Sequence, residues 1–257
     1  MAVVAGVRPL QHHLVVYRRT WRASAFSTVL APILFLTAMG VGLGSFVGTT
    51  TAFGGVSYLA FLAPGLLAAQ AMQTATQESS WPVLAGFKWQ KTFEAAIATP
   101  QGSRDIALGH LYWLVVRVGI VTAAFLITML FFGAWTGWTT ILAWPAAVLT
   151  GLAFGMPMAA WTATRERETS FSIIFRFVIT PLFLFSGTFF PVSQLPPAVQ
   201  PIAWLTPLFH GVALTRALAL GESMEPAAWL IHLGYLVACV VIGTVLALRT
   251  FRKRLVV

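Results

Sequence analysis

Charged residues are scarce in this sequence. Asp, Glu, Lys and Arg together make up 9% of the 257 residues, and only 7 residues are acidic. Soluble domains usually contain about 25% charged residues. Hydrophobic residues make up 58% of the chain. The composition therefore predicts an integral membrane protein, long enough for roughly six or seven spanning helices of about 20 residues each.

Cysteine and the common catalytic motifs are also missing. The single cysteine, Cys239, lies in an apolar run, so no intrachain disulfide forms. The patterns GxxxxGK[ST], HExxH, CxxC and GxSxG do not occur. We therefore expect no catalytic residue, no metal ligand and no cofactor bound by this chain. The five histidines are scattered, and His12 and His13 are more typical of a solvated surface than of a metal site.

The apolar runs are long and continuous rather than alternating, which favours helices over a β-barrel. They predict an all-α membrane protein with six spans, at residues 24–46, 56–79, 106–132, 139–163, 170–190 and 226–249. Gly40, Gly44 and Gly48 form a ladder of small residues in the first span, suited to close helix contact within the subunit or in a dimer.

The net charge of +9 is distributed on one side of these spans. Thirteen of the 16 Lys and Arg residues fall in the N-terminal segment, the connections 81–105 and 165–169, and the C-terminal tail. Basic residues gather in cytoplasmic loops of membrane proteins, so this pattern does not call for a nucleic-acid partner. It predicts a multi-pass protein of the cytoplasmic (inner) membrane with both termini in the cytoplasm.

Two segments outside the spans have helical periodicity. Within residues 1–22, Leu10, Leu14, Tyr17 and Trp21 recur on one face, which is typical either of an interfacial helix or of a charged flank that fixes topology. Residues 88–98 predict a short amphipathic helix. Its apolar stripe is Trp89, Phe93 and Ile97, its charged residues are Lys88, Lys91 and Glu94, and its end is Thr99 and Pro100.

Residues 192–221 cannot form a continuous span. Five prolines fall in or just before this stretch: Pro191, Pro196, Pro197, Pro201 and Pro207. Proline removes a backbone donor and breaks a helix. We expect two half-helices starting near Pro196 and Pro207, with Thr206 as N-cap and Gly221 as the stop. The charge pattern places this re-entrant hairpin on the outer side, as an exit gate with Phe189, Phe190 and Trp204 as walls, or as a structural plug.

Ionisable residues at membrane depth are few. Arg117 lies inside the third span, and Glu78 at the end of the antiparallel second span is its predicted partner. Arg176 is close enough to the inner interface for its side chain to reach it. No chain of Asp or Glu runs through the spans, which argues against a proton-coupled or sodium-coupled carrier.

The run Ser186–Pro191, followed by Leu195–Pro196, Thr206–His210 and Arg216, resembles the C-terminal signature of ABC-2-type permeases. It is most similar to the branch of nodulation-factor (lipo-oligosaccharide) and daunorubicin-type drug exporters. The resemblance implies a pair of identical or different permease chains, two separate ATPase subunits that bind ATP and Mg²⁺, and surrounding membrane lipid.

The resemblance also assigns roles to segments. Residues 1–22 would be the elbow helix and 88–98 the coupling helix that docks on the ATPase. The implied ATPase-coupling residues are Lys88, Trp89, Lys91, Phe93, Glu94, Ile97, Thr99 and Pro100. The implied outer gate residues are Phe189, Phe190, Pro191, Pro196, Trp204, Pro207 and His210.

The expected function is thus the permease subunit of an ATP-driven exporter of an amphipathic substrate: a glycolipid, a lipid-linked saccharide or a hydrophobic drug. Two alternatives stay open. One is an ion-coupled carrier or channel. The other is a membrane-embedded enzyme acting on lipids, with His210 and Arg216 holding a phosphate head group.

Overall fold

The computed structural model describes residues 6–44 and 55–256, and these residues contain helices but no β-strand. The long helices are α1 (Val7–Phe35), α3 (Tyr58–Glu78), α6 (Ser103–Phe131), α7 (Ala143–Thr162), α11 (Pro207–Leu220) and α12 (Pro226–Leu255). The shorter elements are η1 (Leu36–Leu43), α4 (Trp81–Lys88), α5 (Thr92–Ile97), η3 (Trp138–Leu142), α8 (Thr169–Ile174), η4 (Phe175–Ile179), α9 (Thr180–Phe185), η5 (Val192–Gln194) and α10 (Gln200–Trp204).

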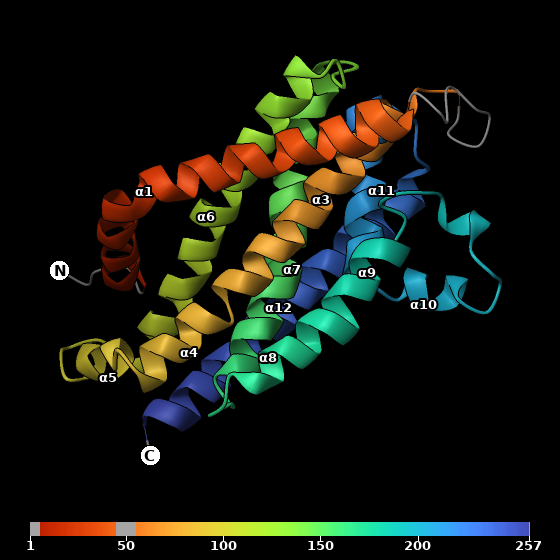
Figure 1. The fold of residues 1–257 in the computed structure, drawn as a ribbon. Helices are drawn as coiled ribbons and strands as arrows, with labels where there is room; N and C mark the ends of the chain where they lie inside the picture. Colours follow the sequence, from red (N-terminus) through yellow and green to blue (C-terminus); the bar gives the residue numbers. More distant parts are fainter. Residues whose placement is uncertain (1–5, 45–54, 257) are drawn as a thin grey trace.

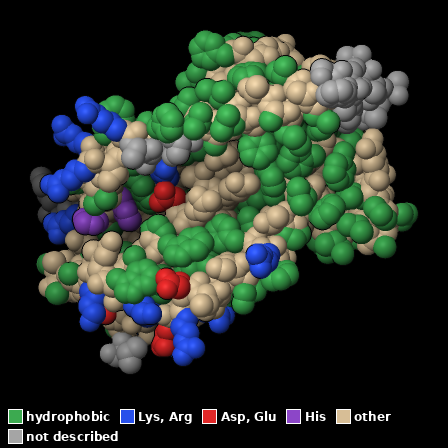
Figure 2. Space-filling model, viewed as in Figure 1, with side chains coloured by type: hydrophobic (Ala, Val, Ile, Leu, Met, Phe, Trp, Pro, Cys, Tyr) green, Lys and Arg blue, Asp and Glu red, His purple; other side chains and the backbone are tan. Residues whose placement is uncertain are grey.

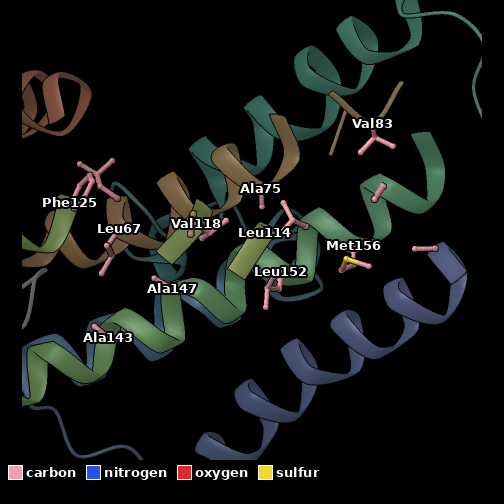
Figure 3. Close-up of a cluster of buried hydrophobic side chains, with 14 of the residues drawn as sticks. Leu67, Ala75, Val83, Leu114, Val118, Phe125, Ala143, Ala147, Leu152 and Met156 are labelled. Atoms are coloured by element: carbon pink, nitrogen blue, oxygen red, sulfur yellow. The ribbon is translucent and has the colours of Figure 1, made fainter. Parts of the chain in front are cut away.

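Helix α7 is the centre of the bundle. It packs against α3, α6, α11 and α12 (Figure 1). Small residues permit this close approach: a Cβ added at Gly151 would lie 2.9 Å from the backbone oxygen of Ala71, and one at Gly243 would lie 2.4 Å from Pro157. Figure 3 shows the apolar core where α3, α6 and α7 meet, with Leu67, Leu114 and Met156 among its buried side chains.

Within the described residues, three helical stretches are long and apolar enough to cross a membrane: Ser103–Phe131, Trp138–Thr162 and Pro226–Leu255. They coincide with the predicted third, fourth and sixth spans. The predicted second span corresponds to α3, which has 21 residues. The chain is therefore an all-helical membrane protein, and the full set of six spans stays a prediction.

The predicted boundary between an elbow helix and a first span is wrong. Helix α1 runs from Val7 to Phe35 without interruption and continues into the π-helical η1. No glycine or proline occurs between Pro9 and Pro32, so nothing in this stretch ends the helix. The change of direction is a bend within α1 (Figure 1). The end of the predicted first span and Gly48 of its glycine ladder lie in residues 45–54, outside the described residues.

The predicted fifth span, 170–190, ends five residues early. The helical run is Thr169–Phe185, and its middle part η4 is a π-helix. Pro181 has no backbone N–H to donate, and the Thr180 hydroxyl donates to the Phe175 carbonyl at 2.8 Å. Beyond Phe185 the chain turns at Gly187, whose φ of 86° favours glycine.

The predicted single helix at 88–98 is wrong as well. Helix α4 ends at Lys88, and α5 begins at Thr92 after a turn in which Lys91 has a left-handed φ of 51°. The rings of Phe87 and Phe93 lie 4.8 Å apart and fold the two helices onto each other. The stripe of Trp89, Phe93 and Ile97 therefore spans a turn rather than one helix face.

The proline-rich segment is broken, as its sequence predicts. Thr206 caps α11 by accepting a hydrogen bond from the Phe209 amide at 3.2 Å, and Gly221 ends it with a φ of 66°. The first half-helix is much shorter than expected. Helix α10 has only five residues and begins at Gln200. A helix begun at Pro196 would carry Pro201 in its interior, where proline has no N–H to donate and clashes with the preceding turn.

Candidate functional site

Helices α4 and α5 form a compact projection at the end of the bundle where α12 finishes (Figure 1). Its surface is exposed: Trp89 is 51% exposed, and Lys91 and Glu94 form a solvent-exposed ion pair at 3.7 Å. Thr99 and Pro100 are exposed beyond α5. Such a surface, charged and carrying an exposed tryptophan, is suited to contact another protein.

Aromatic packing anchors this projection from beneath. Phe87 and Phe93 are buried, and both contact the fully buried Phe251 near the C-terminal end of α12, at 5.0 and 5.8 Å between ring centroids. Ile97 is partly buried and packs against the same cluster. Phe93, predicted as a docking residue, is therefore an anchor inside the projection, and the exposed residues around it form the surface.

Two polar contacts connect α4 to the loop between α7 and α8. The Lys88 ammonium donates to the Glu166 carbonyl at 3.1 Å. Arg254 lies over the Phe87 ring at 4.4 Å and donates to the carbonyls of Ala163 and Arg165 at 3.0 and 2.8 Å. A movement of α4 would therefore be transmitted to α7 and α12.

Sequence reasoning missed Phe251 and Arg254. Both lie in a tail that was interpreted only through its positive charge. The one signal was an aromatic residue, Phe251, within the basic run from Arg249 to Arg254.

Glu78 and Arg117 lie together, where α3 ends and α6 passes it. Arg117 Nε donates to one carboxylate oxygen of Glu78 at 2.9 Å. The indole of Trp113, which the sequence analysis did not single out, donates to the other oxygen at 3.0 Å. The carboxylate is thus fully engaged by two donors from α6. The role of this pair in transport stays a prediction.

His13 of α1 also reaches this region. Its ring stacks on Trp113 with centroids 5.2 Å apart. Burial, together with the neighbouring His12, lowers the pKa of His13 from 6.5 to about 4. The side chain is consequently neutral at physiological pH, because desolvation disfavours the cation.

His210 connects α10, α11 and α12 around the proline-rich segment. Its Nε2 donates to the Trp204 carbonyl at 3.0 Å, so the neutral ring accepts at Nδ1 from His232 Nδ1, 2.8 Å away on α12. The ring also stacks on Tyr235 at 4.1 Å, and the Tyr235 hydroxyl donates to the Leu205 carbonyl. His232 and Tyr235 were not singled out by sequence reasoning, since both sit in an apolar span distant in sequence.

The other predicted gate residues divide by burial. Phe189 is buried and packs edge-to-face on Phe183 at 5.0 Å. Phe190, Pro191 and Pro207 are partly buried, and Pro196 and Trp204 are exposed. They do not converge on a single point.

Arg216 and His210 do not form the head-group site considered above. Arg216 donates to the carbonyls of Phe61 and Gly187 at 3.2 and 2.8 Å. His210 instead uses both ring nitrogens on Trp204 and His232. The two side chains therefore have different partners. Within the described residues, no group of three His, Cys, Asp or Glu side chains is placed to hold a metal ion.

Comparison with known proteins identifies the family. The model of the family described as ABC-2 type transporter matches residues 10–220. This chain belongs to the ABC-2 type transporter family. Nodulation protein J of Rhizobium leguminosarum bv. viciae is 34% identical over 250 residues, covering 94% of each chain. Nodulation protein J of Rhizobium meliloti (strain 1021) is 33% identical over 94% of this chain and 93% of its own.

A more distant ABC-2 relative is the inner membrane transport permease YadH of Escherichia coli (strain K12), 25% identical over 82% of this chain and 80% of its own. The chain is therefore a membrane transport permease. Its family is that of the permease components of transporters, not of the catalytic components. Family membership implies partnership with an ABC ATPase.

Proposed function

We propose that this chain is the permease subunit of an ATP-driven exporter that moves an amphipathic substrate out of the cytoplasm or the inner leaflet. The observation that carries the proposal is the exposed α4–α5 projection, held on α12 by Phe251 and linked to the α7–α8 loop by Lys88. It offers a separate ATPase both a docking surface and a mechanical connection to the bundle. ATP and Mg²⁺ would be bound by that partner.

The relatives and the spans support the proposed substrate class. Two relatives are nodulation proteins, which supports a glycolipid or lipid-linked saccharide; a hydrophobic drug is the other candidate of the same character. The apolar, nearly charge-free spans suit such cargo. Two ATPase subunits and a second permease chain, identical or different, would complete the transporter.

In the proposed topology six spans cross the inner membrane and both termini face the cytoplasm. The distribution of charge supports it. In Figure 2, Lys and Arg side chains gather where α1 begins and around α4 and α5, whereas the end that carries α10 shows none. Positively charged residues are retained on the cytoplasmic side of membranes. The segment η5–α10–α11 would then face outward as a re-entrant hairpin.

Association with an ATPase tests the proposal. The full chain is co-expressed with an ATPase encoded beside it, and the complex is purified through the permease. Trp89→Glu, on the exposed turn between α4 and α5, should abolish co-purification and substrate-stimulated ATP hydrolysis. Trp138→Glu, which changes another exposed tryptophan away from the projection, is the matched control and should retain both. Transport that proceeds without any ATPase, or that collapses only with an ion gradient, would refute the proposal.

A further inference from the structure

A cavity of about 530 Å³ lies between the first half of α1 and α6, with α4 and α5 along its side. Figure 2 shows a recess in this part of the surface, with acidic and histidine side chains at its margin. The cavity has no part in the exporter cycle proposed above. Its lining includes Arg8, His12, Tyr17, Gln90 and Arg117.

Some polar groups that line this cavity have hydrogen-bond partners and one does not. Both carboxylate oxygens of Glu78 are engaged, one by Arg117 Nε and one by the Trp113 indole. Arg117 Nη1 is buried and has no hydrogen-bond partner among the described residues. A buried, unpaired donor on a charged group is costly. Arg117, which lines the cavity, is therefore a cation with a donor for which the described protein supplies no acceptor.

The charge around the opening points the same way. Arg8 and His12 line the cavity and are exposed. Among the described lining residues Glu78 is the one acidic group, and its charge is balanced by Arg117, so Arg8 leaves the lining with a net positive charge. Arginine forks match phosphate oxygens geometrically. An anion rich in acceptor oxygens fits this arrangement.

A sugar fits it less well, although aromatic residues line the cavity. Trp113 is only 6% exposed. His13 stacks on its face at 5.2 Å, and Tyr17 lies edge-on at 5.7 Å. The indole is thus occupied by protein and has no free face for a sugar ring to stack on.

An apolar groove continues along the same pair of helices. A second cavity of about 300 Å³ is lined by Val29 and Ile33 of α1 and by Ala124, Ile127 and Phe131 of α6. Ala124 lies seven residues beyond Arg117, or about 10 Å along a helix. A polar cavity and an apolar groove therefore follow one another along α1 and α6.

We propose that the α1–α6 cavity binds the phosphate of a membrane phospholipid, with an acyl chain along the groove. The phosphate accepts hydrogen bonds from Arg117 and Arg8. The proposal goes beyond the exporter function, since it needs no assumption about cargo; only the assignment to the inner leaflet uses the proposed topology. A lipid at this position joins α1 to the α4–α5 projection.

Native mass spectrometry of the full chain bound to its ATPase tests this site, with phosphatidylglycerol as the probe and diacylglycerol as the phosphate-free control. Wild type should retain one tightly bound phosphatidylglycerol. Arg117→Gln should weaken binding by about ten-fold or more, the loss expected for a charge-assisted contact. Glu78→Gln should preserve or tighten binding, because it releases the guanidinium from its carboxylate.

Opposite effects of the two variants separate lost binding from lost folding. Arg8→Gln, at the exposed opening, should weaken binding without disturbing the fold. Arg249→Gln, an exposed arginine elsewhere on the cytoplasmic side, is the matched control and should bind as wild type does. Equal retention by wild type and Arg117→Gln, or equal competition by diacylglycerol, would overturn the site. Displacement by glycerol phosphate alone at matched concentration would overturn the lipid source and assign the site to a soluble phosphate ester.

Discussion

Partly buried arginines bind irregular backbone in this protein. Arg216 binds carbonyls of α3 and of the turn at Gly187, and Arg254 binds carbonyls at the C-terminal end of α7 and just beyond it. A guanidinium suits this role because its fork reaches several acceptors at once. At the end of α7 its charge also complements the helix dipole. Lysine could not make these contacts together.

His13 should make stability depend on pH. Its pKa is about 4 in the folded chain, compared with about 6.5 when unfolded. As the pH falls, the unfolded state therefore takes up the proton first. The stability associated with a neutral His13 is complete above about pH 6.5 and is lost as the pH falls towards 4.

Thermal unfolding of the full chain at pH 5, 6, 7 and 8 measures this effect. His13→Phe keeps a ring against Trp113 but cannot be protonated, so its Tm should fall less between pH 7 and pH 5 than that of wild type. His12→Phe, at an exposed position, should keep most of the wild-type dependence, because burial, the larger cause of the lowered pKa of His13, remains. Identical profiles for wild type and His13→Phe would contradict the assignment.

At the scale of elements, the α4–α5 projection depends on α12. Phe87, Phe93 and Phe251 come from three helices, and their contacts replace the hydrophobic stripe expected of one longer helix. These contacts attach the projection to α12, as the proposed coupling to an ATPase requires.

Phe251→Ala should loosen this projection. Removing a fully buried phenylalanine costs about 3–5 kcal/mol, and here the loss falls on the seat of α4 and α5. Hydrogen exchange in residues 81–97 should rise and ATPase co-purification should fall, with membrane insertion retained. Phe177→Ala, at a residue that is 68% exposed, is the matched control and should change neither. Unchanged exchange in residues 81–97 would refute the coupling.

Two roles are open for the proline-rich segment η5–α10–α11: an exit gate or a structural plug. His210 ties it to α12 through His232 and to Trp204 within the segment itself. A plug would use these contacts for stability alone, whereas a gate would use them to control its opening.

His210→Ala removes both hydrogen bonds, a loss of about 1–3 kcal/mol. For a gate we expect impaired export with the chain still folded, the ATPase still bound and Tm lowered by only a few degrees. Ile202→Ala, in exposed α10, is the control for truncation in this segment. Export at the wild-type level, or a general loss of folding, would favour the plug. Phe190→Ala should behave as His210→Ala does.

At the scale of the whole molecule, the two ends of the bundle differ in character. One end carries the basic side chains and the α4–α5 projection, and the other carries α10 and its apolar surface (Figures 1 and 2). A permease that couples ATP on one side to release on the other needs such polarity.

Cysteine labelling checks the orientation. In a Cys239→Ser background, single cysteines replace Ser193 and Lys253, both of which are exposed. A membrane-impermeant maleimide should label Ser193→Cys in intact cells and Lys253→Cys only after permeabilisation. The reverse pattern, or labelling of both in intact cells, would refute the proposed topology.

The sequence by itself determined the class of protein and much of its local structure. Scarce charge and long apolar runs suffice for a helical membrane protein, because burial in lipid is a property of composition. The cap at Thr206 and the stop at Gly221 also follow from single residues, since proline, glycine and a capping hydroxyl act within one helical turn. The resemblance to the family signature in residues 186–216 likewise depends on single residues of this stretch.

Only the tertiary structure decided how separate helices meet. The helix breaks at Lys91, between α4 and α5, because Phe87 and Phe93 both pack against Phe251, which is distant in the sequence. Likewise, Trp113 completes the partners of Glu78, and His232 those of His210, although neither neighbour has a local signal. Helical periodicity reports which side of a helix is apolar, but it does not say which distant side chain will fill the space against it, and that packing places both the projection and the phosphate cavity.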